Sequence, residues 1–149
     1  MKKTCFFLLA ICLLTGTACE KEKEPNSKSG KITISEDEYI VMTILPEMIS
    51  SNLLNKWIIE NHTKNDMIYG TPFSLEYFNK NSWAAIQLDI EWEDIGLTLL
   101  AGKTTEGEIN LYSLVEKYNN SKKGKYRIIK NIIFQNIGSY NLCAEFEII

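Results

Sequence analysis

The stretch from Gly124 to Lys130, Gly-Lys-Tyr-Arg-Ile-Ile-Lys, constrains the fold more than any other part of the chain. Gly124 ends the polar run 119–123, where a residue that tolerates positive φ suits a turn. Tyr126 begins a segment rich in β-branched residues. Ile128 follows on the same face, because side chains alternate along a strand. The stretch therefore predicts a turn that leads directly into a strand with one buried face.

Short segments with strand character recur along the rest of the chain. Tyr39–Leu45 is a β-branched run closed by Pro46, and it predicts an edge strand that ends in a kink or a strand switch. Helical spacing relates Leu111, Leu114, Val115 and Tyr118, which predict one short helical segment. Further strands are predicted within 52–61, 67–78, 83–90, 91–100, 108–111 and 140–149. Seven to nine short strands with one helical segment predict an all-β, antiparallel β-sandwich.

The turn and strand at Gly124 resemble a known structural signature. In immunoglobulin-like sandwiches, a tyrosine two residues before a core position of strand F bonds through its hydroxyl to the turn upstream. Gly124-x-Tyr126-x-Ile128 resembles this tyrosine corner. The resemblance implies structural roles for the Gly124 backbone and the Tyr126 hydroxyl.

The segment from Asn52 to Ile148 resembles the bacterial immunoglobulin-like domain family. The residues that carry the resemblance are Glu60-Asn61, Tyr69-Gly70, Leu75-Glu76, Trp83, Asp94-Ile95-Gly96, Gly124–Ile128 with Lys130, and Ala144-Glu145-Phe146. The resemblance implies an extracytoplasmic accessory domain with an immunoglobulin-like fold and no catalytic residues. It also implies that Ile59, Phe73 and Ile128 fill the space between the sheets by packing, because no pair of cysteines is available there.

The first residues have the features of an export signal. Lys2 and Lys3 precede the nine apolar residues Phe6–Leu14, a segment too short to span a bilayer as a helix. Small residues follow up to Ala18, and Cys19 comes next. This order resembles a bacterial lipoprotein signal, which implies lipidation of Cys19, although Gly16 stands where that motif usually has leucine. The alternative is an ordinary signal peptide cleaved near Ala18, which would leave Cys19 as a free thiol.

We expect three segments: a signal peptide over 1–18, a flexible charged tether over 19–30 and the sandwich domain over 31–149. Residues 20–30 contain no apolar side chain, so this segment cannot offset the entropy lost on ordering. The charged start of the tether resembles tracts that send some Gram-negative lipoproteins to the outer surface, and a plain spacer is the alternative. We therefore expect the cell envelope as the location, with the membrane contacted through a lipid on Cys19.

Few residues have the chemistry of a catalytic site. His62 is the one histidine, and we interpret it as a solvated residue in the polar turn 61–66. Cys143 is the one cysteine beyond the tether, and we interpret it as structural. It shares a predicted strand face with Glu145 and Glu147, so we expect partial exposure, and carboxylates that raise its pKa do not favour a nucleophile. We predict no catalytic residues and no enzyme activity.

The acidic residues around Trp92 form the one remaining candidate site. Glu91, Glu93 and Asp94 could bind calcium, or a sugar could stack on the indole, but the spacing of a calcium loop is absent. We therefore favour a solvated strand edge and predict neither a metal nor a cofactor. The chain also lacks a phosphate loop, and its net charge of −3 without a basic stripe argues against nucleic acid as a partner.

Two classes of function remain. We favour a membrane-anchored, non-catalytic binding or accessory module whose loops or sheet edges contact a protein or a glycan. The alternative is an envelope structural or assembly lipoprotein whose partner is a neighbouring complex. The residues that bind the ligand are not identifiable from these patterns.

Overall fold

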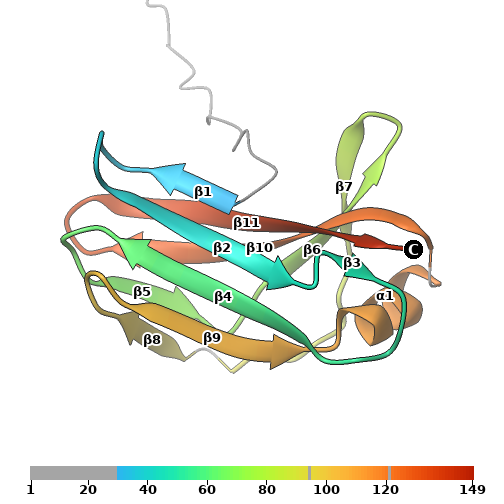
Figure 1. Ribbon diagram of the computed structural model, residues 1–149. Coiled ribbons are helices and arrows are strands. Elements are labelled where there is room, and N and C mark those ends of the chain that lie inside the picture. The colour runs from blue at the N-terminus through green and yellow to red at the C-terminus, as the bar shows by residue number, and fades with distance from the viewer. Residues whose placement is uncertain (1–29, 94, 121) are drawn as a thin grey trace, which may run out of the picture.

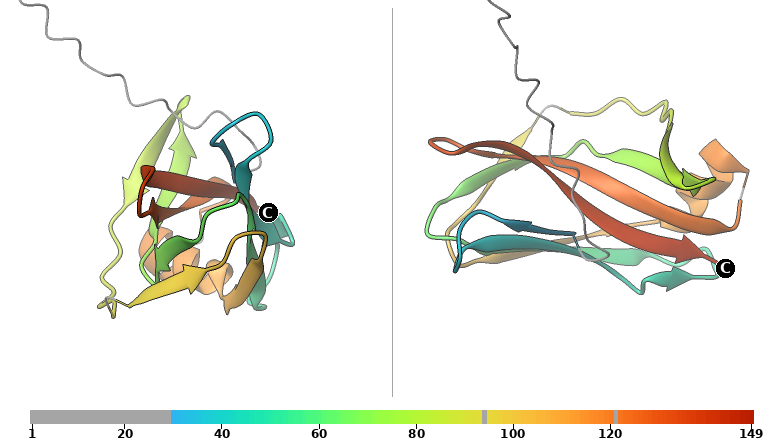
Figure 2. Two further views of the ribbon diagram at one scale, coloured as in Figure 1. Left: turned by 90° about the vertical axis from the view of Figure 1, so that its left-hand side faces the viewer. Right: turned by 90° about the horizontal axis from the view of Figure 1, so that it is seen from above.

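The computed structural model describes residues 30–93, 95–120 and 122–149. Within these ranges the chain forms two β-sheets and one helix, which confirms the predicted immunoglobulin-like β-sandwich with one short helical segment. Figure 1 shows one sheet in front of the other, and Figure 2 shows the same layers from the end and from above. No helix in the described ranges is long and apolar enough to cross a bilayer.

The front sheet has four strands in the order β1-β2-β4-β9. Their bounds are β1 Gly30–Thr33, β2 Tyr39–Leu45, β4 Asn55–His62 and β9 Thr104–Ile109. All neighbours in this sheet are antiparallel. On β4, Trp57 and Ile59 point into the sandwich while the side chains between and beside them point outward, as the alternation along a strand requires.

The back sheet has seven strands, and β10 and β11 form its long central pair. The bounds are β3 Met48–Ile49, β5 Met67–Gly70, β6 Ser74–Asn79, β7 Ser82–Ile86, β8 Gly96–Leu99, β10 Gly124–Phe134 and β11 Gly138–Ile148. Both β5 and β6 pair with the same edge of β10. The β6–β7 hairpin projects away from the body in Figures 1 and 2.

The core lies between the sheets and comes from alternate residues of facing strands. The inward residues of β2 and β10 that are at most 1% exposed are Ile40, Met42, Ile44, Tyr126, Ile128, Ile132 and Phe134. Burial of each large apolar side chain stabilises the fold by roughly 1.5–3 kcal/mol. Lys130 is the one charged residue in the inward row of β10, and it is only 5% exposed.

The prediction that Tyr39–Leu45 is an edge strand is wrong, whereas the predicted strand switch is present. β2 lies between β1 and β4 and pairs on both sides. Pro46 follows Leu45, the last paired residue, so the missing N–H of proline removes no bond from the ladder. After Pro46 the chain crosses to the back sheet, where Met48 and Ile49 pair in parallel with the end of β11.

Several predicted boundaries also differ from the structure. The strands predicted within 83–90 and 91–100 are shorter, β7 Ser82–Ile86 and β8 Gly96–Leu99. Gly30, which the sequence analysis places in the tether, pairs with Met42 as the first residue of β1. A Cβ atom at Gly30 would lie 1.3 Å from the carbonyl oxygen of Cys143, so the close crossing of the two chains requires glycine. The strand predicted at 108–111 begins at Thr104, because pairing with β4 extends through a polar segment without apolar alternation.

The helix α1, Leu111–Asn119, covers one end of the sandwich (Figure 1). Its side chains Leu111 and Val115 are fully buried, as the spacing predicted. Asn110 caps the N-terminus by accepting a hydrogen bond from the Ser113 amide at 2.9 Å. Asn120 ends the helix in the left-handed conformation, and the chain then turns into β10.

Candidate functional site

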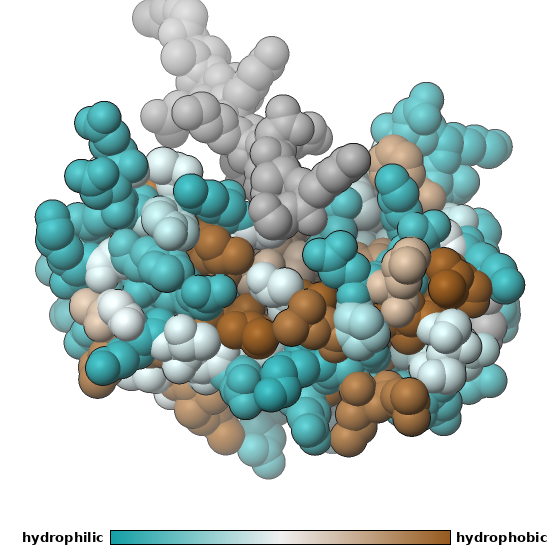
Figure 3. All heavy atoms as spheres, in the orientation of Figure 1, coloured by the Kyte–Doolittle hydropathy of each residue, from teal (hydrophilic) through white to brown (hydrophobic). Residues whose placement is uncertain are grey.

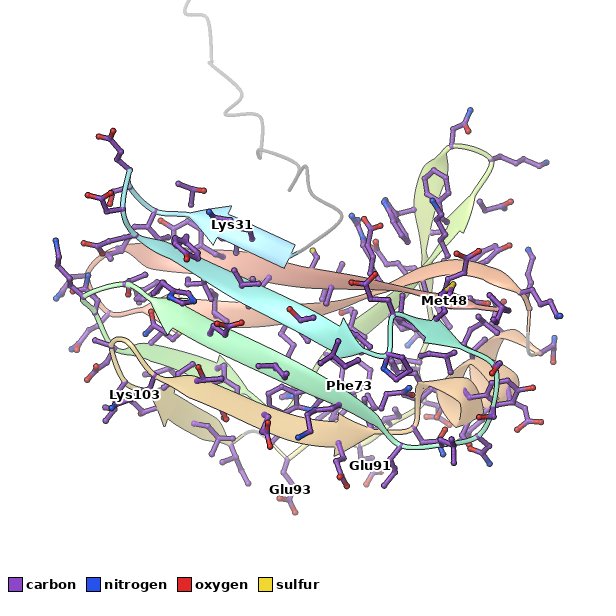
Figure 4. All side chains as sticks on the ribbon, viewed as in Figure 1. Lys31, Met48, Phe73, Glu91, Glu93 and Lys103 are labelled. Carbon is purple, nitrogen blue, oxygen red and sulfur yellow. The ribbon has the colours of Figure 1, made fainter. Side chains whose placement is uncertain are left out.

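A pocket of about 240 Å³ opens at the side of the sandwich, between β9 and the connection that joins β5 to β6. The residues that form most of its wall come from both sheets and from two connections: Met42, Trp57, Tyr69, Thr71, Phe73, Trp92, Glu108, Ile128 and Lys130. Figure 4 shows Phe73 behind the front sheet, and it shows Glu91 and Glu93 below β9, pointing away from the body. Most of the side chains in this wall are apolar or aromatic.

The pocket lies where the pairing beside β10 passes from β5 to β6 and is interrupted. β5 pairs with Ile132 and Ile133, and β6 pairs with residues 126–129, so Lys130 has no ladder partner on that side. The interruption falls at Thr71-Pro72-Phe73. Pro72 has no N–H to donate, so it cannot form the ladder hydrogen bond that a continuous strand would make with β10. The chain bulges there, and the bulge leaves space beside Lys130.

The side chain of Lys130 fills the gap in the ladder with its own hydrogen bonds. Its Nζ donates to the carbonyl oxygens of Thr71 at 3.2 Å and Pro72 at 3.3 Å. Nζ also lies 5.6 Å from the centre of the Trp57 ring, within reach of a cation–π interaction. Burial lowers the pKa of Lys130 from 10.5 to about 8, because it penalises the ammonium form. Among the described residues Lys130 has no carboxylate partner.

The aromatic walls are held in place by contacts with each other and with glycine. A Cβ atom at Gly107 would lie 2.5 Å from the Trp57 ring, so this indole packs directly on the β9 backbone. Trp57 meets Tyr69 edge-on, with ring centres 6.3 Å apart. Across the pocket, Phe73 and Trp92 also meet edge-on, at 4.8 Å. Trp92 is 36% exposed, so it forms the rim rather than the base.

Only part of the predicted Trp92 edge belongs to this site. Trp92 lines the pocket, as Phe73 does, whereas Glu91 and Glu93 are exposed and outside the lining. Asp94 lies outside the described residues. Within those residues no group of three or more histidine, cysteine or acidic side chains could hold a metal ion. The groups that the pocket offers to a ligand are the buried amine of Lys130 and the aromatic rings around it.

Tyr126 and Gly124 lie at the start of β10, before Ile128 and Lys130, and neither residue lines the pocket. The Tyr126 hydroxyl donates to the carbonyl oxygen of Lys122 and accepts from Asn119 Nδ2 at 2.8 Å. Its ring is fully buried and stacks on Phe146. Gly124 has a φ of 136°, and a Cβ atom there would lie 3.1 Å from the Tyr77 ring. Both residues therefore contact the turn and its neighbours rather than the pocket.

Neither His62 nor Cys143 reaches the pocket. His62 is the last residue of β4 rather than part of the turn, because Tyr39 pairs with it and stacks on its ring at 4.5 Å. Its Nε2 lies 3.1 Å from Glu60 Oε2 at the surface.

The prediction that Cys143 is partly exposed is wrong. The side chain is only 6% exposed, although it shares its strand face with Glu145 and Glu147 as expected. Burial raises the pKa of the thiol, and the nearby carboxylates of Glu76 and Glu145 add to that effect while Arg127 opposes it. Cys19 lies outside the described residues.

Sequence reasoning missed Lys130 as a site residue and included it only as part of a resemblance. The signal was available in the alternation of β10, where Lys130 takes an inward position between Ile128 and Ile132. A lysine at an inward position of a strand must find hydrogen-bond partners inside the protein. The Thr71-Pro72 interruption that supplies them is 58 residues earlier in the chain, so no local pattern connects the two.

Comparisons with known proteins give one informative result. A family model described as a bacterial Ig-like domain matches residues 36–147. No curated protein matches the chain. Among solved structures, a protein from Archaeoglobus fulgidus matches at 9% identity over 80% of this chain and 92% of that chain, with a TM-score of 0.28. That score is too low for the likeness to carry an argument.

Proposed function

Because the chain belongs to the bacterial immunoglobulin-like domain family, we propose that it is a lipid-anchored binding module of the bacterial cell envelope. The family match covers residues 36–147, and the leader and tether that we propose lie before it. The basic start, the short apolar segment and the small residues before Cys19 support lipidation at that cysteine. Acyl chains contribute about 0.8 kcal/mol per buried CH₂ group, so more than one chain makes a stable anchor.

The observation that carries the binding role is the pocket around Lys130. Its open side, its four rings and its buried amine are features of a recognition site. A domain built only for spacing has no need to bury a lysine without a carboxylate partner, because a buried ammonium costs stability. We therefore place the binding site at the rim formed by Phe73 and Trp92.

An envelope structural or assembly lipoprotein is the second candidate, and exposed apolar residues favour it. Met48, Leu53 and Leu54 in the connection between β2 and β4 are each more than 60% exposed. This connection is held to α1, because Asn52 Oδ1 accepts from Asn110 Nδ2 at 2.5 Å and Ser113 Oγ at 2.6 Å. Figure 3 shows further apolar clusters on the face of the front sheet. A neighbouring complex could cover such a surface.

Cell fractionation tests the anchor. Cys19→Ala should release the protein into the soluble fraction or leave the precursor uncleaved, because the acceptor of the lipid is gone. The matched control is Cys12→Ala, which changes a cysteine within the apolar segment and should leave the protein in the membrane fraction. If the Cys19→Ala protein is processed and stays with the membrane, the lipoprotein proposal is wrong.

Substitutions at the two surfaces separate the two candidates. Trp92→Ala should abolish the cellular role if the pocket is the contact site. Leu53→Asp with Leu54→Asp should abolish it if a neighbouring complex covers the β2–β4 connection. Both sites are exposed, so each protein should fold, and circular dichroism checks this.

A further inference from the structure

We propose that the pocket binds a carboxylate carried by one ring-sized apolar group. The carboxylate contacts Lys130 Nζ, and the ring lies against Trp57, Phe73 and Trp92. This inference rests on the proposed binding function and specifies the ligand that the same site would take.

The hydrogen-bond donors of Lys130 indicate the anion. An ammonium group has three donors, and the carbonyl oxygens of Thr71 and Pro72 take two of them. Carbonyl groups accept hydrogen bonds but carry no charge to neutralise the ammonium. None of the described residues forms an ion pair with Lys130, and its side chain lines the pocket. A carboxylate entering the pocket would supply both a third acceptor and the missing negative charge.

The number and type of charges favour a monoanion over a phosphate. Phosphate sites usually combine arginine forks, backbone N–H groups or helix N-termini. Here one amine faces two carbonyl oxygens, which repel further negative charge, and Glu108 lines the same pocket. One positive charge beside these oxygens suits a group with a single negative charge.

The size and lining of the pocket define the rest of the ligand. About 240 Å³ is below the range of roughly 300–1,000 Å³ typical of sites for drug-sized molecules. The space suits one aromatic ring and a short linker rather than an oligosaccharide. The two edge-on pairs, Trp57 with Tyr69 and Phe73 with Trp92, offer ring faces and edges to such a group. Two sources share this chemistry: a free arylacetic acid, and the C-terminal carboxylate of a peptide that ends in an aromatic residue.

Three titratable groups line the pocket: Lys130, Glu108 and Tyr69. Burial lowers the pKa of Lys130 to about 8, so above this pH the free site loses the ammonium that the carboxylate needs. Affinity for a carboxylate should then fall about tenfold between pH 7 and pH 9, because binding above the pKa requires the uptake of a proton. An uncharged analogue should not show this loss.

The experiment uses the full-length chain in detergent with phenylacetate and its uncharged analogue phenylacetamide as probes. Calorimetry gives the affinities, and the three indole N–H signals locate the site by nuclear magnetic resonance. At pH 7 phenylacetate should bind about tenfold more tightly than phenylacetamide, or better. It should shift the signals of Trp57 and Trp92 and leave that of Trp83, which lies on the β6–β7 hairpin. A tripeptide ending in phenylalanine, with a free or an amidated C-terminus, tells the two sources apart.

Lys130→Met should remove the preference for the carboxylate. Lys125→Met, an exposed outward lysine on the same strand, should keep it. If Lys130→Met does not fold, the unsubstituted protein gives the same test. Its affinity for phenylacetate should fall between pH 7 and pH 9, whereas its affinity for phenylacetamide should not. Equal affinity for phenylacetate and phenylacetamide, or the absence of binding by either probe and either peptide, would overturn the inference. Neither result affects the fractionation of Cys19→Ala, so this inference and the anchor can fail separately.

Discussion

The side-chain nitrogen of Lys130 donates to the carbonyl oxygen of Thr71 at 3.2 Å, across the interruption between β5 and β6. The contact takes the place of a ladder bond that the strand beside β10 cannot make. It also holds an amine at the base of a pocket that the same interruption opens. The structural role of Lys130 and its proposed binding role therefore come from one departure from regular pairing.

Stability should depend on pH through Lys130. The pKa of Lys130 is about 8 in the folded protein and about 10.5 in the unfolded chain, so the unfolded chain binds more protons between these values. The free energy of unfolding should therefore rise with pH in this window, by at most about 1.4 kcal/mol per unit. Urea unfolding between pH 7.5 and pH 9.5 measures the slope. Lys130→Met should flatten it and Lys125→Met should not. A slope that Lys130→Met leaves unchanged would assign the effect to another group.

The Tyr126 hydroxyl should contribute to stability through its two hydrogen bonds. Tyr126→Phe leaves the carbonyl oxygen of Lys122 and the side-chain amide of Asn119 without this partner, and because both bonds are partly buried the loss should cost about 1–3 kcal/mol. The midpoint of denaturant unfolding should fall, and the slope should change little. Tyr112→Phe is the matched control, because its hydroxyl has no hydrogen bond to a described residue. If both variants have the midpoint of the parent, the corner does not stabilise this domain.

The position of Trp57 should depend on the glycine beneath it. Gly107→Ala places a Cβ atom 2.5 Å from the indole, so the ring or the β9 backbone must shift. We expect a loss of about 1–3 kcal/mol of stability, as for other overpacked sites, and a shifted Trp57 indole signal. Gly96→Ala, a strand glycine with a nearest contact of 3.3 Å to the Ile68 side chain, should do less. Equal effects of the two substitutions would argue against the packing described for Trp57.

The Cys143 thiol should react slowly in the folded protein. Burial limits access to the sulfur, and the raised pKa keeps the thiolate fraction low. Labelling with a thiol reagent at pH 8 should be slow without denaturant and fast in urea. Cys143→Ser identifies the signal, because Cys19 and the leader cysteines are unchanged in that variant. Rapid labelling of Cys143 in the folded chain would contradict its burial.

Local sequence patterns predicted the elements whose buried face is set by the spacing of their own apolar residues. The alternation in β10 and the spacing of Leu111, Val115 and Tyr118 each encode one buried face, and both elements are present. The edge position expected for β2 was wrong because a proline after a strand does not show whether the strand itself has two neighbours. That information lies in the pairing partners, which are distant in sequence.

The pocket could not be predicted for the same reason. Its base is on β10, its walls are on β4 and β9, and Phe73 and Trp92 lie in connections. We expected a solvated strand edge at Trp92, whereas Trp92 lies in the connection between β7 and β8 and lines the pocket. The burial of Cys143 was missed because strand alternation gives the face of a residue, not what covers that face.

We propose that the anchored domain makes its contacts at the rim of the Lys130 pocket. A photoreactive amino acid in place of Trp92, in the full-length chain in cells, tests it most directly, with the intact mass of the protein as the readout. We expect a light-dependent adduct at position 92 that is lost when Lys130→Met or Cys19→Ala is added. The same photoreactive group at Asn81, in the tip of the β6–β7 hairpin, should give none. Equal adducts at both positions, or none at position 92, would contradict the claim.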